Sequence, residues 1–75
     1  MATKTLDAKG LVCPLPVLRA NKAIKELRGG DVLEVLVTDP GAPKDLEIFC
    51  ENTGHQLLDS REEDGFFAIT IRKQE

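Results

Sequence analysis

The sequence has no tryptophan or tyrosine, one histidine, two cysteines and no long hydrophobic run. With the histidine and cysteines far apart in sequence no zinc ligand set is visible, and we expect neither a metal nor a cofactor. No charged-then-apolar leader follows Met1 and no segment reaches the length of a membrane span, so we expect a cytoplasmic protein without a membrane partner. In that compartment both thiols should stay reduced.

An excess of positive charge is also absent, since 10 Lys and Arg residues stand against 13 Asp and Glu residues and the formal net charge is −3. Binding to a phosphate backbone needs clustered Lys and Arg, so we do not expect a direct nucleic-acid partner. The 75 residues suffice for one domain, at 1–75, near the lower size limit for a single hydrophobic core.

Hydrophobic periodicity predicts the order strand, helix, strand, helix, strand, strand. The predicted strands are 3–8, 32–38, 57–60 and 66–72, and the predicted helices are 14–28 and 43–53. We expect Gly29 and Gly30 to stop the first helix and Gly54 to stop the second. Residues 62–65 should form a hairpin turn, because an Asp-Gly pair favours the positive φ that such turns need.

This order predicts an α/β fold, more specifically an α+β two-layer sandwich of βαβαββ topology. The first two strands, joined through a helix, should be parallel, and the last two should form an antiparallel hairpin. The result is a mixed four-stranded sheet with two helices on one face. Leu36 and Phe66 would lie on the other face, either as a second contact surface or as part of a partly apolar open sheet.

The CPLP stretch at residues 13–16 places a thiol at the start of the first predicted helix. Proline is tolerated in a first helical turn, so Pro14 and Pro16 should shape the helix start and leave Cys13 at or next to the N-cap. Unpaired N–H groups and the positive end of the helix dipole predict a lowered pKa and a nucleophilic thiolate for Cys13. The alternative is a free cysteine that merely fills a small apolar space.

Two leucines close to the thiol lie off the core stripe of the first helix. At 100° per residue, Leu15 and Leu18 fall on the side of Arg19 and Lys22. They could form an apolar docking patch with a basic rim for a partner that approaches Cys13. They could equally be ordinary exposed apolar residues or pack under the preceding loop.

Both helices should begin at the same edge of the sheet, beyond the carboxyl ends of the parallel strands, where sites in α/β proteins tend to lie. Asp39, Lys44 and Asp45 would then lie near Cys13, and the two carboxylates either cap the second helix or act at the thiol. His55 follows the second helix by about 18 Å, so a Cys/His catalytic pair is not expected.

Cys50 falls on the apolar stripe of the second helix. We therefore expect a buried, unreactive thiol, with a resolving cysteine as the alternative.

The CPxP stretch is accompanied by other residues at distinctive separations. The full set is Leu6, Asp7, Gly10, Leu11, Cys13, Pro14, Pro16, Lys22, Leu27, Gly30, Asp39, Pro40, Asp45, Gly54 and His55. Together they resemble the TusA/SirA-like sulfur-carrier family over nearly the whole chain. The family's fold is a two-layer α/β sandwich similar to the C-terminal domain of a bacterial translation initiation factor.

The resemblance implies that Cys13 accepts sulfane sulfur as a persulfide and passes it to a partner protein. Donors in the family are cysteine desulfurases and rhodanese-like proteins, and acceptors serve tRNA 2-thiouridine formation, molybdenum cofactor synthesis or dissimilatory sulfur oxidation. Such a sulfurtransferase-type carrier has no independent turnover without its donor and acceptor. Gly41, Ala42 and Pro43 replace a more polar stretch of the best-known members, which leaves the acceptor open.

Two other functions fit the same residues. One is a non-catalytic regulatory or interaction module in which the CPLP turn is only structural. The other is a peroxide-sensing thiol, which would need Cys50 or an external thiol to resolve a sulfenic acid.

Overall fold

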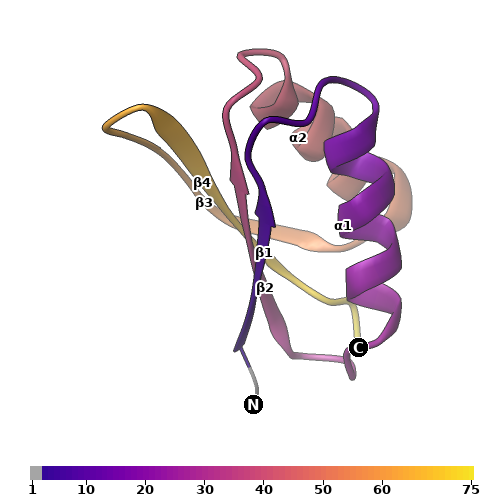
Figure 1. Ribbon diagram of the computed structural model, residues 1–75. Coiled ribbons are helices and arrows are strands. Elements are labelled where there is room, and N and C mark those ends of the chain that lie inside the picture. The colour runs from indigo at the N-terminus through magenta and orange to yellow at the C-terminus, as the bar shows by residue number, and fades with distance from the viewer. Residues whose placement is uncertain (1–2) are drawn as a thin grey trace.

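The computed structural model describes residues 3–75 and contains four strands and two helices. Their bounds are β1 (Thr3–Ala8), α1 (Leu15–Lys25), β2 (Val32–Val37), α2 (Ala42–Thr53), β3 (Gln56–Glu63) and β4 (Phe66–Arg72). The strands form one sheet in the order β1-β2-β4-β3, and both helices cover the same face of it (Figure 1). The predicted two-layer α+β fold is therefore confirmed.

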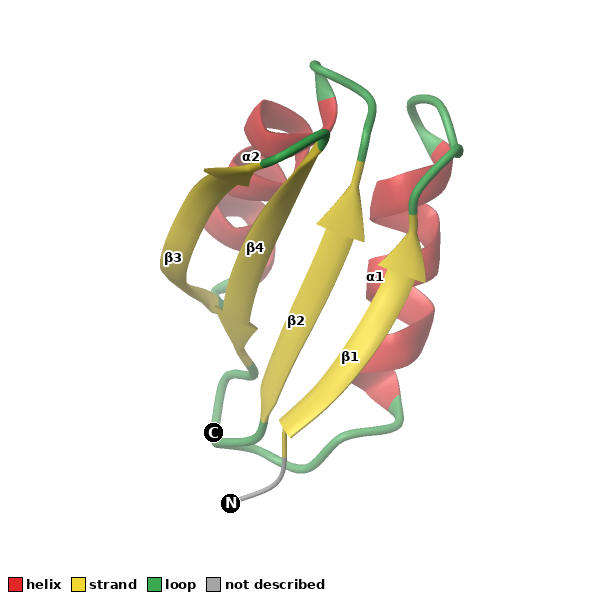
Figure 2. Cartoon of the chain, turned by 60° about the vertical axis from the view of Figure 1, so that its left-hand side comes forward, coloured by secondary structure: helices red, strands yellow, loops and turns green. Residues whose placement is uncertain are grey.

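Strand β2 is central and links a parallel pair to an antiparallel hairpin. It pairs in parallel with β1 from Thr3↔Val32 to Ala8↔Val37 and antiparallel with β4, while β4 pairs antiparallel with β3 (Figure 2). Alternate side chains of β2 point into the helical layer and are fully buried. The core comprises Leu33, Val35, Val37, Ile69 and Ile71 of the sheet together with Ala20, Ala23, Ile24, Leu46, Phe49 and Cys50 of the helices.

The end of α1 differs from the prediction. The helix stops at Lys25, where the N–H groups of Glu26 and Leu27 bond to carbonyls three residues back and tighten the last turn. Gly30 has φ +90° but lies in the following turn, where its N–H donates to the Lys73 carbonyl at 3.0 Å. The prediction that Gly29 and Gly30 stop the helix was wrong, because this segment is held by the end of β4.

The other two glycine predictions concern α2 and the hairpin. Gly54 caps α2 with φ +84°, as predicted. Gly65 has φ +86° and forms a two-residue loop with Asp64, because Glu63 already pairs with Phe66. The predicted four-residue turn was therefore too long, and β3 runs from Gln56 to Glu63 instead of covering only 57–60.

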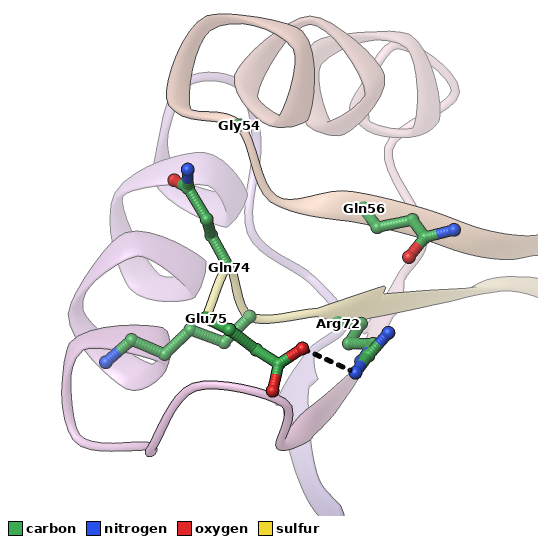
Figure 3. Close-up of a pocket in the computed structure, with 6 residues that line it drawn as sticks. Gly54, Gln56, Arg72, Gln74 and Glu75 are labelled. Carbon is green, nitrogen blue, oxygen red and sulfur yellow. Dashed lines mark hydrogen bonds and ion pairs between the residues drawn. The ribbon is translucent and has the colours of Figure 1, made fainter.

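The C-terminal residues close the end of the molecule opposite to the β1–α1 loop (Figure 1). A hollow of about 180 Å³ there is lined by Gly54, Gln56, Arg72, Lys73, Gln74 and Glu75. Figure 3 shows Arg72 joined to Glu75, a contact of 3.1 Å. The Gln74 N–H also donates to Nδ1 of His55 at 3.0 Å, so His55 serves in anchoring this end.

Candidate functional site

The loop between β1 and α1 presents Cys13 at the surface. The thiol is exposed, Pro14 occupies the N-cap of α1, and Pro16 is buried in the first turn. The Gly10 N–H donates to Oγ1 of Thr38 at 2.9 Å, which fixes the loop to the end of β2. Cys13 therefore lies directly before the helix start, as the CPLP stretch predicts.

Asp39 connects the backbone of Cys13 to the start of α2. Its Oδ2 accepts the Cys13 N–H at 2.8 Å, and its Oδ1 accepts the N–H of Gly41, the N-cap of α2, at 3.2 Å. The Asp39 carboxylate thus joins the loop that carries Cys13 to the turn directly before α2. The expected meeting of the two helix starts at one edge of the sheet is confirmed by these bonds.

Asp45 lies in the first turn of α2 and acts on the thiol itself. Hydrogen bonding of the thiol to the Asp45 carboxylate is the largest cause that raises the pKa of Cys13 above its usual value. Partial desolvation and the negative charges of Asp45 and Asp39 raise that pKa further. The predicted lowering of the Cys13 pKa was wrong, because two carboxylates at the start of α2 outweigh the favourable field of the α1 start.

Lys44 is exposed and its ammonium group pairs with Glu47 at 3.3 Å, one turn along α2. This ion pair runs along α2, and the expected place of Lys44 near Cys13 stays a prediction. We therefore attach no step of the chemistry to Lys44.

Three large apolar side chains within five residues of Cys13 in the sequence are exposed. Val12 is 65% exposed, Leu15 40% and Leu18 56%. We call these three residues the apolar patch. Arg19 and Lys22 are also exposed and follow on the same helix. The sequence left open whether the two leucines were exposed or packed under the preceding loop, and the structure shows that both are exposed. The sequence analysis missed Val12, because a loop position gives no periodicity from which exposure could be inferred.

The second cysteine and the histidine lie elsewhere. Cys50 is only 4% exposed in the core, and burial raises its pKa to about 11. His55 contacts the ring of Phe49 at the far end of α2, with ring centroids 5.7 Å apart. Burial and the charge of Lys73 lower the pKa of His55. Both placements agree with the prediction of a buried thiol and of no Cys/His pair.

The site therefore offers one exposed thiol, the Asp45 carboxylate that raises its pKa, and the Asp39 carboxylate that accepts the Cys13 N–H. Within residues 3–75 there is no cluster of three or more His, Cys, Asp or Glu side chains suited to a metal ion. In the same range, neither helix is long and apolar enough to cross a membrane. This arrangement can form and break a covalent bond at the Cys13 sulfur, and the Asp45 carboxylate can accept the thiol proton.

Comparison with known proteins places these residues in context. The family model described as "Sulfurtransferase TusA" matches residues 4–73. A sulfur carrier protein TusA of Allochromatium vinosum is 50% identical, covering 91% of this chain and 90% of its own, and one of Pseudomonas entomophila is 47% identical, covering 93% and 88%. A crystal structure of a SirA-like protein from Desulfitobacterium hafniense superposes with a TM-score of 0.85 at 40% identity, over 96% of this chain and 99% of that one.

Proposed function

Since the chain belongs to the TusA sulfurtransferase family, we propose that it is a sulfur carrier in which Cys13 holds sulfane sulfur as a persulfide. The observation that carries the proposal is the exposed Cys13 thiol directly before the start of α1, in a loop whose Cys13 N–H is held by Asp39 at 2.8 Å. No other thiol of the chain competes for this role, because Cys50 is buried.

Sulfur uptake is a displacement at sulfur. As the Cys13 sulfur attacks the outer sulfur of a donor persulfide, the Asp45 carboxylate, which influences the pKa of this thiol, accepts the S–H proton. The new S–S bond forms while the donor's own S–S bond breaks, and the donor leaves as a thiolate that takes up a proton. The outer sulfur atom passes from the donor to Cys13 without any external oxidant or reductant.

Delivery reverses the sequence. A nucleophile of the acceptor attacks the outer sulfur of the Cys13 persulfide, and Cys13 leaves as a thiolate. Protonation then restores the Cys13 thiol. Pro16 replaces the second cysteine of a CxxC motif, so no intramolecular disulfide within this loop can release the sulfur before an acceptor arrives.

Donor and acceptor proteins would dock beside the thiol. We assign this contact to Leu15 and Leu18 of the apolar patch with the cations of Arg19 and Lys22, which are all exposed on the turns of α1 that follow Cys13. A cysteine desulfurase or rhodanese-like protein fits as donor, and a protein of a thiolation, cofactor-synthesis or sulfur-oxidation relay fits as acceptor. A reducing compartment such as the cytoplasm suits a carrier whose thiol must stay free.

The decisive experiment is the intact mass of the protein after exposure to polysulfide, before and after a reductant. We expect a reducible gain of about 32 Da, the mass of one sulfur atom, on a thiol of this accessibility. The gain should disappear in Cys13→Ser and persist in the matched variant Cys50→Ser. Equal uptake by Cys13→Ser would contradict the proposal.

A second measurement separates the carrier from an interaction module. If the CPLP turn is only structural, Cys13→Ser restores the phenotype of a deletion strain as well as the wild type does. We expect the carrier function to be lost in that complementation, while Cys50→Ser restores it. Peroxide treatment followed by a sulfenate probe tests the sensor alternative in the same two variants.

A further inference from the structure

The two edges of the sheet are protected to different degrees. Along the β3 edge, the register shifts between Leu57 and Asp59, and Arg61 forms ion pairs with Asp59 at 3.0 Å and Glu63 at 3.1 Å. Bulges and charged side chains of this kind prevent a further strand from pairing. Strand β1 instead pairs with β2 through all six residues without a shift, and its outer side faces solvent (Figure 2).

A groove lies between this open β1 edge and α1. It measures about 430 Å³, against about 180 and 290 Å³ for the two hollows near the C-terminus. Its apolar floor is formed by Leu6, which packs against the core, and by buried Ala23. Its rim is formed by Lys4, Arg19, Lys22 and Glu26.

The charges of the rim favour an anionic occupant. Lys4 pairs with Glu26 at 3.2 Å, whereas neither Arg19 nor Lys22 forms an ion pair among residues 3–75. Three cations thus face one carboxylate in a protein whose formal net charge is −3. An island of positive potential on an otherwise acidic molecule attracts acidic segments and discriminates against basic ones.

We propose that the groove binds an extended acidic segment of the protein that exchanges sulfur with Cys13, and that this segment adds to the sheet as a fifth strand beside β1. Backbone hydrogen bonds to β1 supply affinity, and acidic side chains on alternate residues reach Arg19 and Lys22, which supplies specificity. This inference rests on the proposed function, because it names the docking mode of the donor or acceptor.

The groove leads toward the thiol. Strand β1 ends at Ala8, and the chain then passes through the loop that carries Cys13. A segment paired along the six residues of β1 spans about 20 Å, with one end at this loop. Arg19 follows Cys13 by six positions, which corresponds to about 9 Å along a helix. A bound segment would therefore place its parent protein beside the loop that carries Cys13.

The first test uses a blocked, fluorescein-labelled ten-residue peptide of alternating Glu and Val, titrated into the full chain and followed by fluorescence anisotropy. We expect saturable binding that weakens with salt. The double variant Arg19→Glu, Lys22→Glu should bind at least about tenfold more weakly. The matched control Lys25→Glu, Arg28→Glu makes the same charge change outside the groove and should stay within about twofold of wild type.

The second test addresses strand pairing without altering the protein. One version of the peptide carries N-methyl groups on its odd residues and the other on its even residues. In an extended strand these two sets of N–H groups point to opposite edges, so each version loses the donors of one edge of the peptide. We expect one version to bind like the parent and the other to lose binding. Equal effects of the two methylation patterns would overturn the fifth strand.

Other occupants give other outcomes. Equal binding of a matched ten-residue peptide of alternating Lys and Val would remove the charge argument and overturn the proposal. Tighter binding of a single-stranded RNA oligonucleotide, or dimerisation of the chain that the Glu-Val peptide does not reverse, would assign the groove to a different occupant. If the Glu-Val peptide does not bind but the wild-type protein takes up sulfur from polysulfide normally, only this inference is overturned. If the peptide binds but the protein takes up no sulfur, only the proposed function is overturned.

Discussion

The two thiols of this chain have raised pKa values for different reasons. Cys13 is exposed, and its pKa is raised first by the hydrogen bond to Asp45. Cys50 is buried in the core, and burial alone raises its pKa to about 11. A neighbouring carboxylate can be neutralised by an approaching partner or by mutation, whereas burial is relieved only when the protein opens. Exposure, not the direction of the pKa shift, therefore distinguishes Cys13 from Cys50.

Under the proposed function, this difference also explains how the Cys13 thiol can stay unreactive between transfers. A protonated Cys13 reacts slowly with stray electrophiles, because the thiolate is the nucleophile. A donor protein that brings a cation near Asp45 would weaken the effect of the carboxylate at the moment of transfer. Cys50 has no such access, so no partner can activate it in the folded state.

The largest expected effect is the selectivity of alkylation. In native protein treated with iodoacetamide at pH 8, we expect Cys13 to react at least about a hundredfold faster than Cys50, whose reaction requires local opening. Peptide mass mapping over time gives both rates. In denaturant the two should react at similar rates, which serves as the control. Comparable rates in the native protein would break the comparison between the two thiols.

The next effect is the pH dependence of Cys13. Its alkylation rate should rise with pH and reach half its maximum above 9.0, the ordinary value for the thiol. Asp45→Asn removes the anionic acceptor and its charge, so the pKa falls, the profile moves to lower pH, and the variant reacts several times faster near pH 7. Glu47→Gln, which removes a carboxylate elsewhere on α2, is the matched control. An unshifted profile in Asp45→Asn would contradict the role of this carboxylate.

A smaller effect should appear in stability at alkaline pH. The folded pKa of Cys50 is raised to about 11, so its contribution to stability is fully present below the unfolded pKa and is lost as pH rises through the folded value. The midpoint temperature of thermal unfolding should therefore fall more steeply between pH 9 and 11 for the wild type than for Cys50→Ala. Lysine titration is common to both proteins and cancels in the difference. Parallel curves would show that burial of Cys50 does not govern its ionisation.

The fold follows closely from sequence pattern, because alternation in β2 and the helical stripes of α1 and α2 leave few ways to bury the same residues. Element ends were less predictable. Gly30 looked like a helix stop, yet it bonds to Lys73, a contact that spans most of the chain and has no local signal.

The position of the site could be predicted from the sequence, but the direction of the Cys13 pKa shift could not. Cys13 and its helix start are marked by the prolines, and the topology brings Asp39 and Asp45 to the same edge. Whether those carboxylates favour or oppose the thiolate depends on which atoms they face. Asp39 faces a backbone N–H and Asp45 faces the thiol, and nothing in residue type or spacing separates the two arrangements.

The smallest expected effect concerns the bonds that hold the Cys13 loop. The two carboxylate oxygens of Asp39 accept the N–H groups of Cys13 and Gly41. Asp39→Asn keeps only one side-chain acceptor, so one of these two N–H groups loses its partner, and we expect a loss of about 1 kcal/mol in the free energy of unfolding.

Hydrogen exchange followed by NMR can tell which bond is lost. Loss of the Asp39 charge lowers the Cys13 pKa, so polysulfide uptake is compared per thiolate after the Cys13 pKa of each protein has been measured. If the Cys13 N–H exchanges faster while the Gly41 N–H is unchanged, the local turn retains the amide oxygen and the thiol loop is freed, and uptake per thiolate should then slow. If only Gly41 is affected, the bond across to Cys13 is the stronger of the two, and uptake per thiolate should stay near the wild-type rate. Unchanged exchange at both N–H groups would show that the carboxylate does not hold the loop, and that packing of Pro16 in the first turn of α1 is enough to fix the position of Cys13.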